Sequence, residues 1–139
     1  MGNWAAKAQG VMRIVIGFTF SCHGAQKLLG LFGGMGGHGR AHVGSLPWVA
    51  GLIETVFGLL ILFGFFTRPA AFILCGEMAV AYFLVHFPRG FVPLQNGGEL
   101  AVVYCFVFLF FSMAGAGAFS VDGARGGGGG GGGKSRARR

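Results

Sequence analysis

The sequence predicts an all-α membrane protein, a bundle of four transmembrane helices with both termini on the cytoplasmic side. Hydrophobic residues make up 53% of the 139 residues and charged residues only 11%, whereas soluble domains contain roughly 25% charged residues. Four apolar segments approach the roughly 20 residues that are needed to cross about 30 Å of hydrocarbon. Basic residues are also distributed unequally between the connecting segments, and this bias sets the orientation.

The four predicted spans follow one another with short connections. A membrane domain over residues 1–122 contains spans at about 11–32, 47–66, 69–87 and 98–119. Glycine-rich or proline-containing stretches separate them, and the shortest of these, FTRP, makes the second and third helices an antiparallel hairpin. We expect the first span to stay in the protein, because a signal-peptidase site after Ala25 would have His23 where a small residue is required.

The basic residues indicate an N-in, C-in topology in the cytoplasmic (inner) membrane. This arrangement places two basic residues, Arg40 and Arg89, outside and seven inside: Lys7, Arg68, Arg125, Lys134, Arg136, Arg138 and Arg139. Residues 123–139 are predicted to be a flexible, glycine-rich basic tail that cannot build a core. The lipid bilayer is the expected partner of this tail, since each basic residue near an anionic membrane contributes about 1 kcal/mol to the free energy of binding. Nucleic-acid binding is not expected.

Three cysteines are spread over three different spans. Cys22, Cys75 and Cys105 are far apart in sequence and include no CxxC pair, the spacing typical of dithiol redox sites. The sequence therefore predicts that they are small apolar packing residues.

The acidic residues are placed where a soluble protein would not have them. Of four acids, Glu54, Glu77 and Glu99 fall in predicted helices, although an ionisable group at mid-bilayer costs about 2.5 to 3.5 kcal/mol. We expect these groups to be compensated inside the bundle. Lys27 is predicted to pair with Glu54 or Glu99, while Glu77 either is kept neutral by burial or pairs with His23.

Depths estimated at about 1.5 Å per residue place most of these groups in the outer half of the membrane. Arg13, at the inner end of the first span, is expected to extend towards the lipid headgroups. Glu77 and His86 fall on opposite faces of their helix and are not expected to share a pocket. The candidate pocket or ligand-binding residues are Arg13, His23, Lys27, Glu54, Glu77, His86 and Glu99.

Two rows of small residues predict close helix packing. Gly10, Gly17 and Gly24 lie on one face of the first helix, and Gly51 and Gly58 flank Glu54 on the second. Small residues at such positions let transmembrane helices approach closely. A purely structural role for the charges, fixing the register of the helices, remains open. No metal site is predicted, because no HxxxH or ExxH spacing gathers ligands on one helical turn.

Four motifs resemble the DoxX family of small four-helix membrane proteins in order and spacing. They are HGAQKL at 23–28, GLIETVFGLLILFGFFTRPAA at 51–71, NGGELAVVY at 96–104 and GAGAFSVD at 115–122. The resemblance covers roughly residues 10–122. The family is named for a subunit of a quinone-reducing sulfur oxidoreductase, but its other members are mostly uncharacterised. The resemblance therefore implies the fold strongly and the chemistry weakly. The family's recurring polar residues match Arg13, His23, Lys27, Glu54, His86 and Glu99 here, whereas Glu77 is additional.

The sequence and the resemblance together favour a membrane subunit of a quinone-linked oxidoreductase assembly. Such a subunit would supply an intramembrane polar pocket, with no covalently bound cofactor, with quinone as a possible ligand, and with electrons delivered by partner redox subunits. Two alternatives remain. A non-catalytic accessory or assembly subunit needs only the packing seams, and a small-solute or proton carrier needs the ionisable cluster to be wet.

Overall fold

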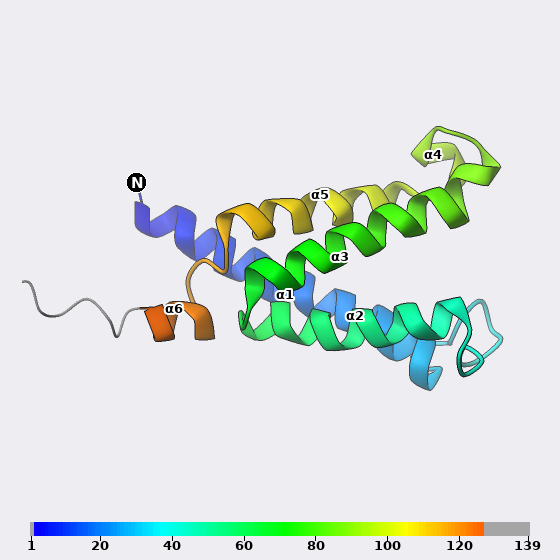
Figure 1. Cartoon of the computed structure of the whole chain (residues 1–139), viewed down its shortest axis with the longest axis horizontal. Coiled ribbons are helices and arrows are strands. Elements are labelled where there is room, and N and C mark those ends of the chain that lie inside the picture. The colour runs from blue at the N-terminus through cyan, green and yellow to red at the C-terminus, as the bar shows by residue number, and fades with distance from the viewer. Residues whose placement is uncertain (1, 127–139) are drawn as a thin grey trace, which may run out of the picture.

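The computed structural model describes residues 2–126, and these residues contain helices and no strand. The four long helices are arranged as two pairs, which can be followed in Figure 1. One pair consists of α1 (Gly2–Leu29) and α2 (Leu46–Phe63), and the other of α3 (Thr67–Ala81) and α5 (Glu99–Ala114). Two short helices, α4 (Pro93–Asn96) and α6 (Val121–Gly126), lie at opposite ends of the bundle. The predicted all-α class is confirmed.

The connections are sorted between the two ends (Figure 1). The N-terminus, the α2–α3 turn and α6 lie at one end, which we call the terminal end. The long loop at 30–45 and α4 lie at the other, which we call the loop end. The α2–α3 turn needs a left-handed backbone at Gly64 (φ 65°), where a Cβ atom would lie 2.8 Å from Cζ of Arg13. Glycine is therefore required there for both conformation and space.

Helices α1 and α2 pack through the predicted glycine seams. A Cβ atom added to Gly17 would lie 2.4 Å from the backbone nitrogen of Leu62, and one added to Gly24 would lie 2.6 Å from that of Thr55. On α2, a Cβ atom at Gly58 would lie 2.7 Å from Oγ of Ser21. The two backbones are close enough that only glycine fits, which confirms the prediction of close approach.

The core is aromatic and the outer surface is apolar as well. Phe20, Phe108 and Phe111 are almost completely buried, and the first two rings meet edge to face with centroids 4.8 Å apart. Large apolar side chains also cover the outside of the long helices, including Phe18, Val56, Phe72 and Phe106. Water would not solvate such a surface, whereas lipid would.

Among the described residues, two helical segments are long and apolar enough to cross a membrane. They are Leu46–Phe63 and Thr67–Arg89, the second being α3 continued by a π-helical turn, η1 (Tyr82–His86), and a 3-10 turn, η2 (Phe87–Arg89). Helix α5 is apolar but has only 16 residues, about 24 Å at 1.5 Å per residue. Helix α1 is longer and more polar.

The helix boundaries differ from the predicted spans mainly at the two ends of the chain. Helix α1 begins at Gly2 rather than near residue 11, and α5 ends at Ala114 rather than at 119 because Gly115 has a φ of 86°. The prediction of a flexible segment from residue 123 is wrong for residues 123–126. These residues belong to α6, where Ser120 Oγ accepts the N–H of Gly123. The rest of the predicted tail, residues 127–139, lies outside the described residues.

Candidate functional site

The candidate residues do not form one pocket but fall into three groups along the bundle. Lys27, Glu54 and Glu77 form a central cluster, with His23 beside it. His86 belongs to a second group at the loop end, and Arg13 to a third at the terminal end. Glu99 is exposed and belongs to none of them.

In the central cluster, α1 and α2 contribute a buried ion pair. Nζ of Lys27 lies 2.5 Å from Oε1 of Glu54, whose exposed fraction is 2%. Gly51 makes room for this pair, since a Cβ atom there would lie 2.9 Å from Cβ of Lys27. The predicted pairing of Lys27 is therefore confirmed with Glu54, and the alternative partner Glu99 is excluded by its exposed position.

Glu77 brings a second carboxyl group to this cluster from α3. It lies close enough to Glu54 and Lys27 for their charges to act on it. Both Glu77 oxygens and Oε2 of Glu54 are buried and have no hydrogen-bond partner among the described residues. Three carboxyl oxygens of the central cluster thus have no partner within residues 2–126. Buried polar atoms without partners are uncommon in native proteins and call for an explanation.

His23 lies beside the cluster without joining it through a hydrogen bond. Its ring packs against Phe20 and Tyr104, with centroids 6.4 and 6.0 Å away. Within residues 2–126 it makes no ion pair with Glu77, so the predicted pairing of these two side chains is not found.

At the loop end, Asn96 organises a group that includes His86. Its side-chain nitrogen donates to the carbonyl of Gly90 (2.7 Å) and to the hydroxyl of Tyr82 (3.3 Å), and its Oδ1 accepts the N–H of Gly98 (2.7 Å). The Tyr82 hydroxyl also donates to the carbonyl of Phe91. Nδ1 of His86 lies 3.3 Å from the carbonyl oxygen of Asn96. His86 is thus separate from Glu77, as predicted, and the role of Asn96 was missed.

At the terminal end, Arg13 is fully buried, so the prediction that it extends to the lipid headgroups is wrong. Its guanidinium donates to five backbone carbonyls, two at the end of α2 and three in the segment after α5. The acceptors are Ile61 (2.6 Å), Leu62 (2.5 Å), Ala116 (2.9 Å), Ala118 (3.4 Å) and Phe119 (2.7 Å). A guanidinium has five N–H donors, and all five find an acceptor inside the protein.

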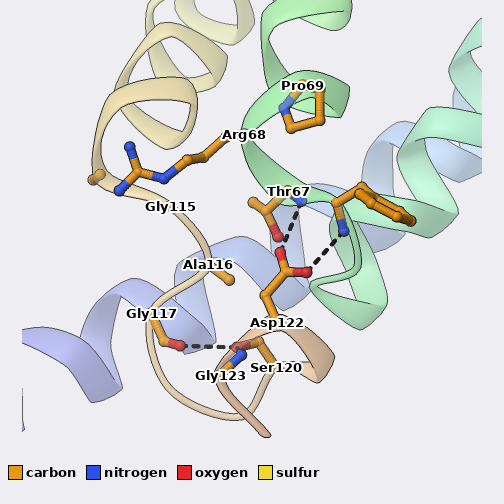
Figure 2. A pocket seen from close by; sticks show the side chains of 11 residues that line it. Thr67, Arg68, Pro69, Gly115, Ala116, Gly117, Ser120, Asp122 and Gly123 are labelled. Atoms are coloured by element: carbon orange, nitrogen blue, oxygen red, sulfur yellow. Dashed lines mark hydrogen bonds between the residues drawn. The ribbon is translucent and has the colours of Figure 1, made fainter. Parts of the chain in front are cut away.

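Three further side chains, Asp122, Gln9 and Arg68, join the end of α5 and the segment after it to the rest of the terminal end. Asp122 accepts the backbone N–H groups of Phe66 and Thr67 (both 2.9 Å) and so caps the start of α3, as Figure 2 shows. Gln9 donates to the carbonyl of Gly115 (2.7 Å), and Arg68 to that of Met113 (2.8 Å). The sequence interpretation missed all three. The signal was available in the motif GAGAFSVD, which ends on an acid that could cap a helix.

Electrostatics at Asp122 favour its ionised form. Desolvation acts to raise the pKa of this carboxyl group, but the hydrogen bonds from Thr67 and Phe66 and the charge of Arg125 outweigh it and bring the pKa below its usual value. Beside this cap lies a hollow of about 430 Å³, lined by Asp122, Thr67, Arg68 and the 114–117 segment (Figure 2). The cap is therefore a charged, partly open feature of the terminal end.

A second hollow, of about 520 Å³, is almost wholly apolar. It lies between α1 and α5 and is lined by Met12, Val102, Val103, Phe106, Val107 and Phe110. Neither of these two hollows is lined by the central cluster. Within residues 2–126, no group of three or more His, Cys, Asp or Glu side chains is placed to hold a metal ion.

A helical protein with an apolar outer surface and a buried charge cluster is, in class, an integral membrane protein. The chain belongs to the DoxX family, whose model matches residues 8–87. It is also 46% identical over 103 residues to an uncharacterized protein of Haemophilus influenzae (strain ATCC 51907 / DSM 11121 / KW20 / Rd), an alignment that covers 72% of this chain and 77% of that relative. No solved structure matches the chain.

Proposed function

We propose that this protein is a four-span protein of the cytoplasmic membrane whose central cluster binds the headgroup of a quinone and exchanges protons with it. In this proposal the protein is the membrane subunit of a quinone-linked redox assembly, and electrons come from a partner redox subunit. The observation that carries the proposal is the ion pair of Lys27 and Glu54 with Glu77 beside it, in which three buried carboxyl oxygens lack partners.

The four-span arrangement is supported by the segment that follows α5 and lengthens it. Its 16 residues fall short of about 30 Å of hydrocarbon, but the 115–119 segment continues it with non-helical backbone. Such backbone is tolerated at membrane depth only where protein satisfies its polar groups, and Arg13 donates to three of these carbonyls. The segment is thus suited to lie within the membrane boundary.

The N-in, C-in orientation is supported by the charges at the two ends. Lys7, Arg68 and Arg125 belong to the terminal end, whereas Arg40 and Arg89 belong to the loop end. Basic residues are in excess on the cytoplasmic side of membrane proteins. Four more basic residues, Lys134, Arg136, Arg138 and Arg139, follow α6 in the sequence.

The chemistry of the cluster fits a quinone better than an inert helix contact. Reduction of a quinone adds two protons to two carbonyl oxygens, so its site needs hydrogen-bond donors and groups that titrate. Lys27 supplies a donor, and the unpartnered oxygens of Glu54 and Glu77 supply proton-exchanging groups. A helix contact that served only for packing would rarely leave three such oxygens unpaired.

The test compares two acids that differ in burial. Glu54→Gln keeps the size of the side chain and removes its ability to exchange a proton, whereas Glu99→Gln makes the same change at an exposed position. With the protein in nanodiscs and decylubiquinone as the probe, we expect Glu54→Gln to weaken quinone binding at least tenfold, which is about 1.4 kcal/mol. Glu99→Gln should bind as the unmodified protein does.

Equal binding by both variants, with both proteins folded, would contradict the proposal. An accessory or assembly role would then replace it. The unpartnered Glu77 also favours a second candidate, a proton carrier. Proteoliposomes that hold a pH-sensitive dye test it, because a carrier would collapse a proton gradient without any quinone and Glu77→Gln would abolish that flux.

A further inference from the structure

Two thiols that are distant in sequence meet between α3 and α5. Sγ of Cys75 and Sγ of Cys105 are 3.7 Å apart, although 30 residues separate them along the chain. The third cysteine, Cys22, belongs to α1, and all three are free thiols. The sequence predicted packing residues because no two cysteines are adjacent. The antiparallel packing of α3 and α5 creates the pair instead.

The separation of the sulfurs suits reversible bonding. A disulfide has a sulfur–sulfur distance of about 2.0 Å, so the two atoms lie less than about 2 Å beyond bonding distance. They already approach as donor and acceptor of a weak S–H hydrogen bond. Side-chain rotation with a small helix adjustment would bring them together, and no element would have to be rearranged.

The thiols also occupy an accessible place. Both cysteines are half-buried and pack against the edge of the hydrophobic core rather than inside it. Their neighbours on the outer faces are exposed apolar side chains, Phe72 on α3 and Phe106 on α5. A reagent that reaches the pair must therefore be soluble in lipid, because only hydrocarbon borders these faces in a membrane.

We propose that Cys75 and Cys105 form a two-electron dithiol/disulfide couple whose oxidant is a lipid-soluble quinone. The identity of the oxidant rests on the proposed function above. In the reaction two S–H bonds break and one S–S bond forms, and the two hydrogens, with their two electrons, pass to the two carbonyl oxygens of the quinone. One quinone becomes one hydroquinone for each disulfide, so atoms and electrons balance. The product is a covalent link between α3, which carries Glu77, and α5.

The experiment uses the full-length protein in nanodiscs with decylubiquinone, read out by maleimide mass-tagging of free thiols and by ultraviolet absorbance of the hydroquinone. The Cys22→Ser variant retains only the proposed pair and is expected to lose both thiols while it forms one hydroquinone per chain. Variants that also carry Cys75→Ala or Cys105→Ala should keep their remaining thiol and form no hydroquinone. Thermal unfolding checks that each variant is folded.

A separate arm tests the geometry alone. Copper-phenanthroline should join Cys75 to Cys105 in the Cys22→Ser variant, and the linked peptides can be identified by mass spectrometry. If copper-phenanthroline gives no disulfide, the proximity is wrong and the proposal fails. If it gives the disulfide and quinone does not, the redox couple with quinone is overturned.

Failure of the dithiol couple can be distinguished from failure of the proposed quinone site at the central cluster. A protein whose quinone binding depends on Glu54 but whose thiols survive excess quinone would overturn the dithiol couple alone. A protein that loses both thiols to quinone, yet binds quinone equally well after Glu54→Gln, would overturn the role of the central cluster alone.

Discussion

Arg13 and Lys27 show two ways to place a cation inside a bundle. Lys27 is a point charge paired with one carboxylate, whereas the planar guanidinium of Arg13 spreads its charge over five backbone carbonyls. An ammonium group has only three donors and no fixed plane, so the two residues are not interchangeable. Arg13 joins the end of α2 to the segment after α5, and Lys27 joins α1 to α2.

We expect Arg13→Met to destabilise the protein more than Lys27→Met does. Removal of the guanidinium strands several buried carbonyls, and each unsatisfied buried acceptor costs about 1 to 3 kcal/mol, so a loss of at least about 3 kcal/mol is expected. Lys27→Met removes the ion-pair partner of Glu54, and the Glu54 carboxylate can then become neutral by binding a proton. Thermal unfolding in detergent measures both losses.

Arg13→Lys is the matched control, since it keeps the charge and offers fewer donors, and its stability should fall between those of the unmodified protein and Arg13→Met. A greater loss in Lys27→Met than in Arg13→Met would contradict this assignment. The sequence alone predicts the opposite order, because it identifies charged partners but not carbonyl acceptors, which every residue possesses.

At the scale of the element, the two helix pairs are held by different means. Helices α1 and α2 approach through glycines that leave no room for a side chain, whereas α3 and α5 pack through larger residues such as Leu74 and Phe111. Glycine seams give close backbone contact in lipid, where no hydrophobic force drives helices together. The first pair is therefore the more sensitive to added volume.

Gly24→Ala is expected to destabilise the α1–α2 pair by about 1 to 3 kcal/mol, the range found when a packed contact is overfilled. Its new methyl group would lie 2.3 Å from Oγ1 of Thr55 and 2.6 Å from the Thr55 backbone nitrogen. Gly76→Ala on α3 is the control, because nothing lies within 4 Å of its new Cβ atom. That change should be neutral or stabilising by up to about 1 kcal/mol, as thermal unfolding of the two variants would show. Equal effects of the two substitutions would mean that the seam is not tightly packed.

The helices and seams could be predicted because they are local properties of the sequence. Apolar length predicted α2 and α3, and the spacing of Gly17 and Gly24 predicted a contact face. The Lys27–Glu54 pair was predictable because a buried charge requires a partner. The π-helical turn at Tyr82–His86 was not predicted from a local pattern. The hydrogen bond that Tyr82 makes with Asn96 was also missed, since it depends on contacts across a loop.

For the whole molecule, the terminal end joins the first and last parts of the chain. Gln9 and Arg13 hold the segment after α5, and Asp122 then caps α3. Long-range contacts of this kind leave little trace in local sequence patterns, which is why the helix ends and the four-residue extension through Gly126 were misjudged. The orientation of the bundle in the membrane stays a prediction.

The Asp122 cap predicts how stability depends on pH. Because the pKa of Asp122 is lower in the folded protein than in the unfolded chain, the cap contributes fully above the unfolded value of about 4, and this contribution is lost as the pH falls through the folded pKa. The Tm difference between the unmodified protein and Asp122→Asn should therefore be greatest above about pH 5 and shrink below about pH 4.

Unfolding scans in detergent at pH values from below about 4 to above about 5 measure this difference. Glu99→Gln, at an exposed acid, serves as the control and should show little change with pH. A Tm difference between the unmodified protein and Asp122→Asn that did not vary with pH would mean that the carboxylate charge does not stabilise the cap.

The guanidinium of Arg13 also bears on the order in which the protein is made. Three of its acceptors are at residues 116–119, more than a hundred positions later in the chain. While the ribosome is still adding α3 and α5, the first helix carries an arginine for which the nascent chain supplies only the two acceptors of α2. The hydrogen bonds of Arg13 are therefore complete only after residues 116–119 have been synthesised. A chain that terminates early would expose this arginine, a chemical mark by which quality control could separate unfinished copies from finished ones.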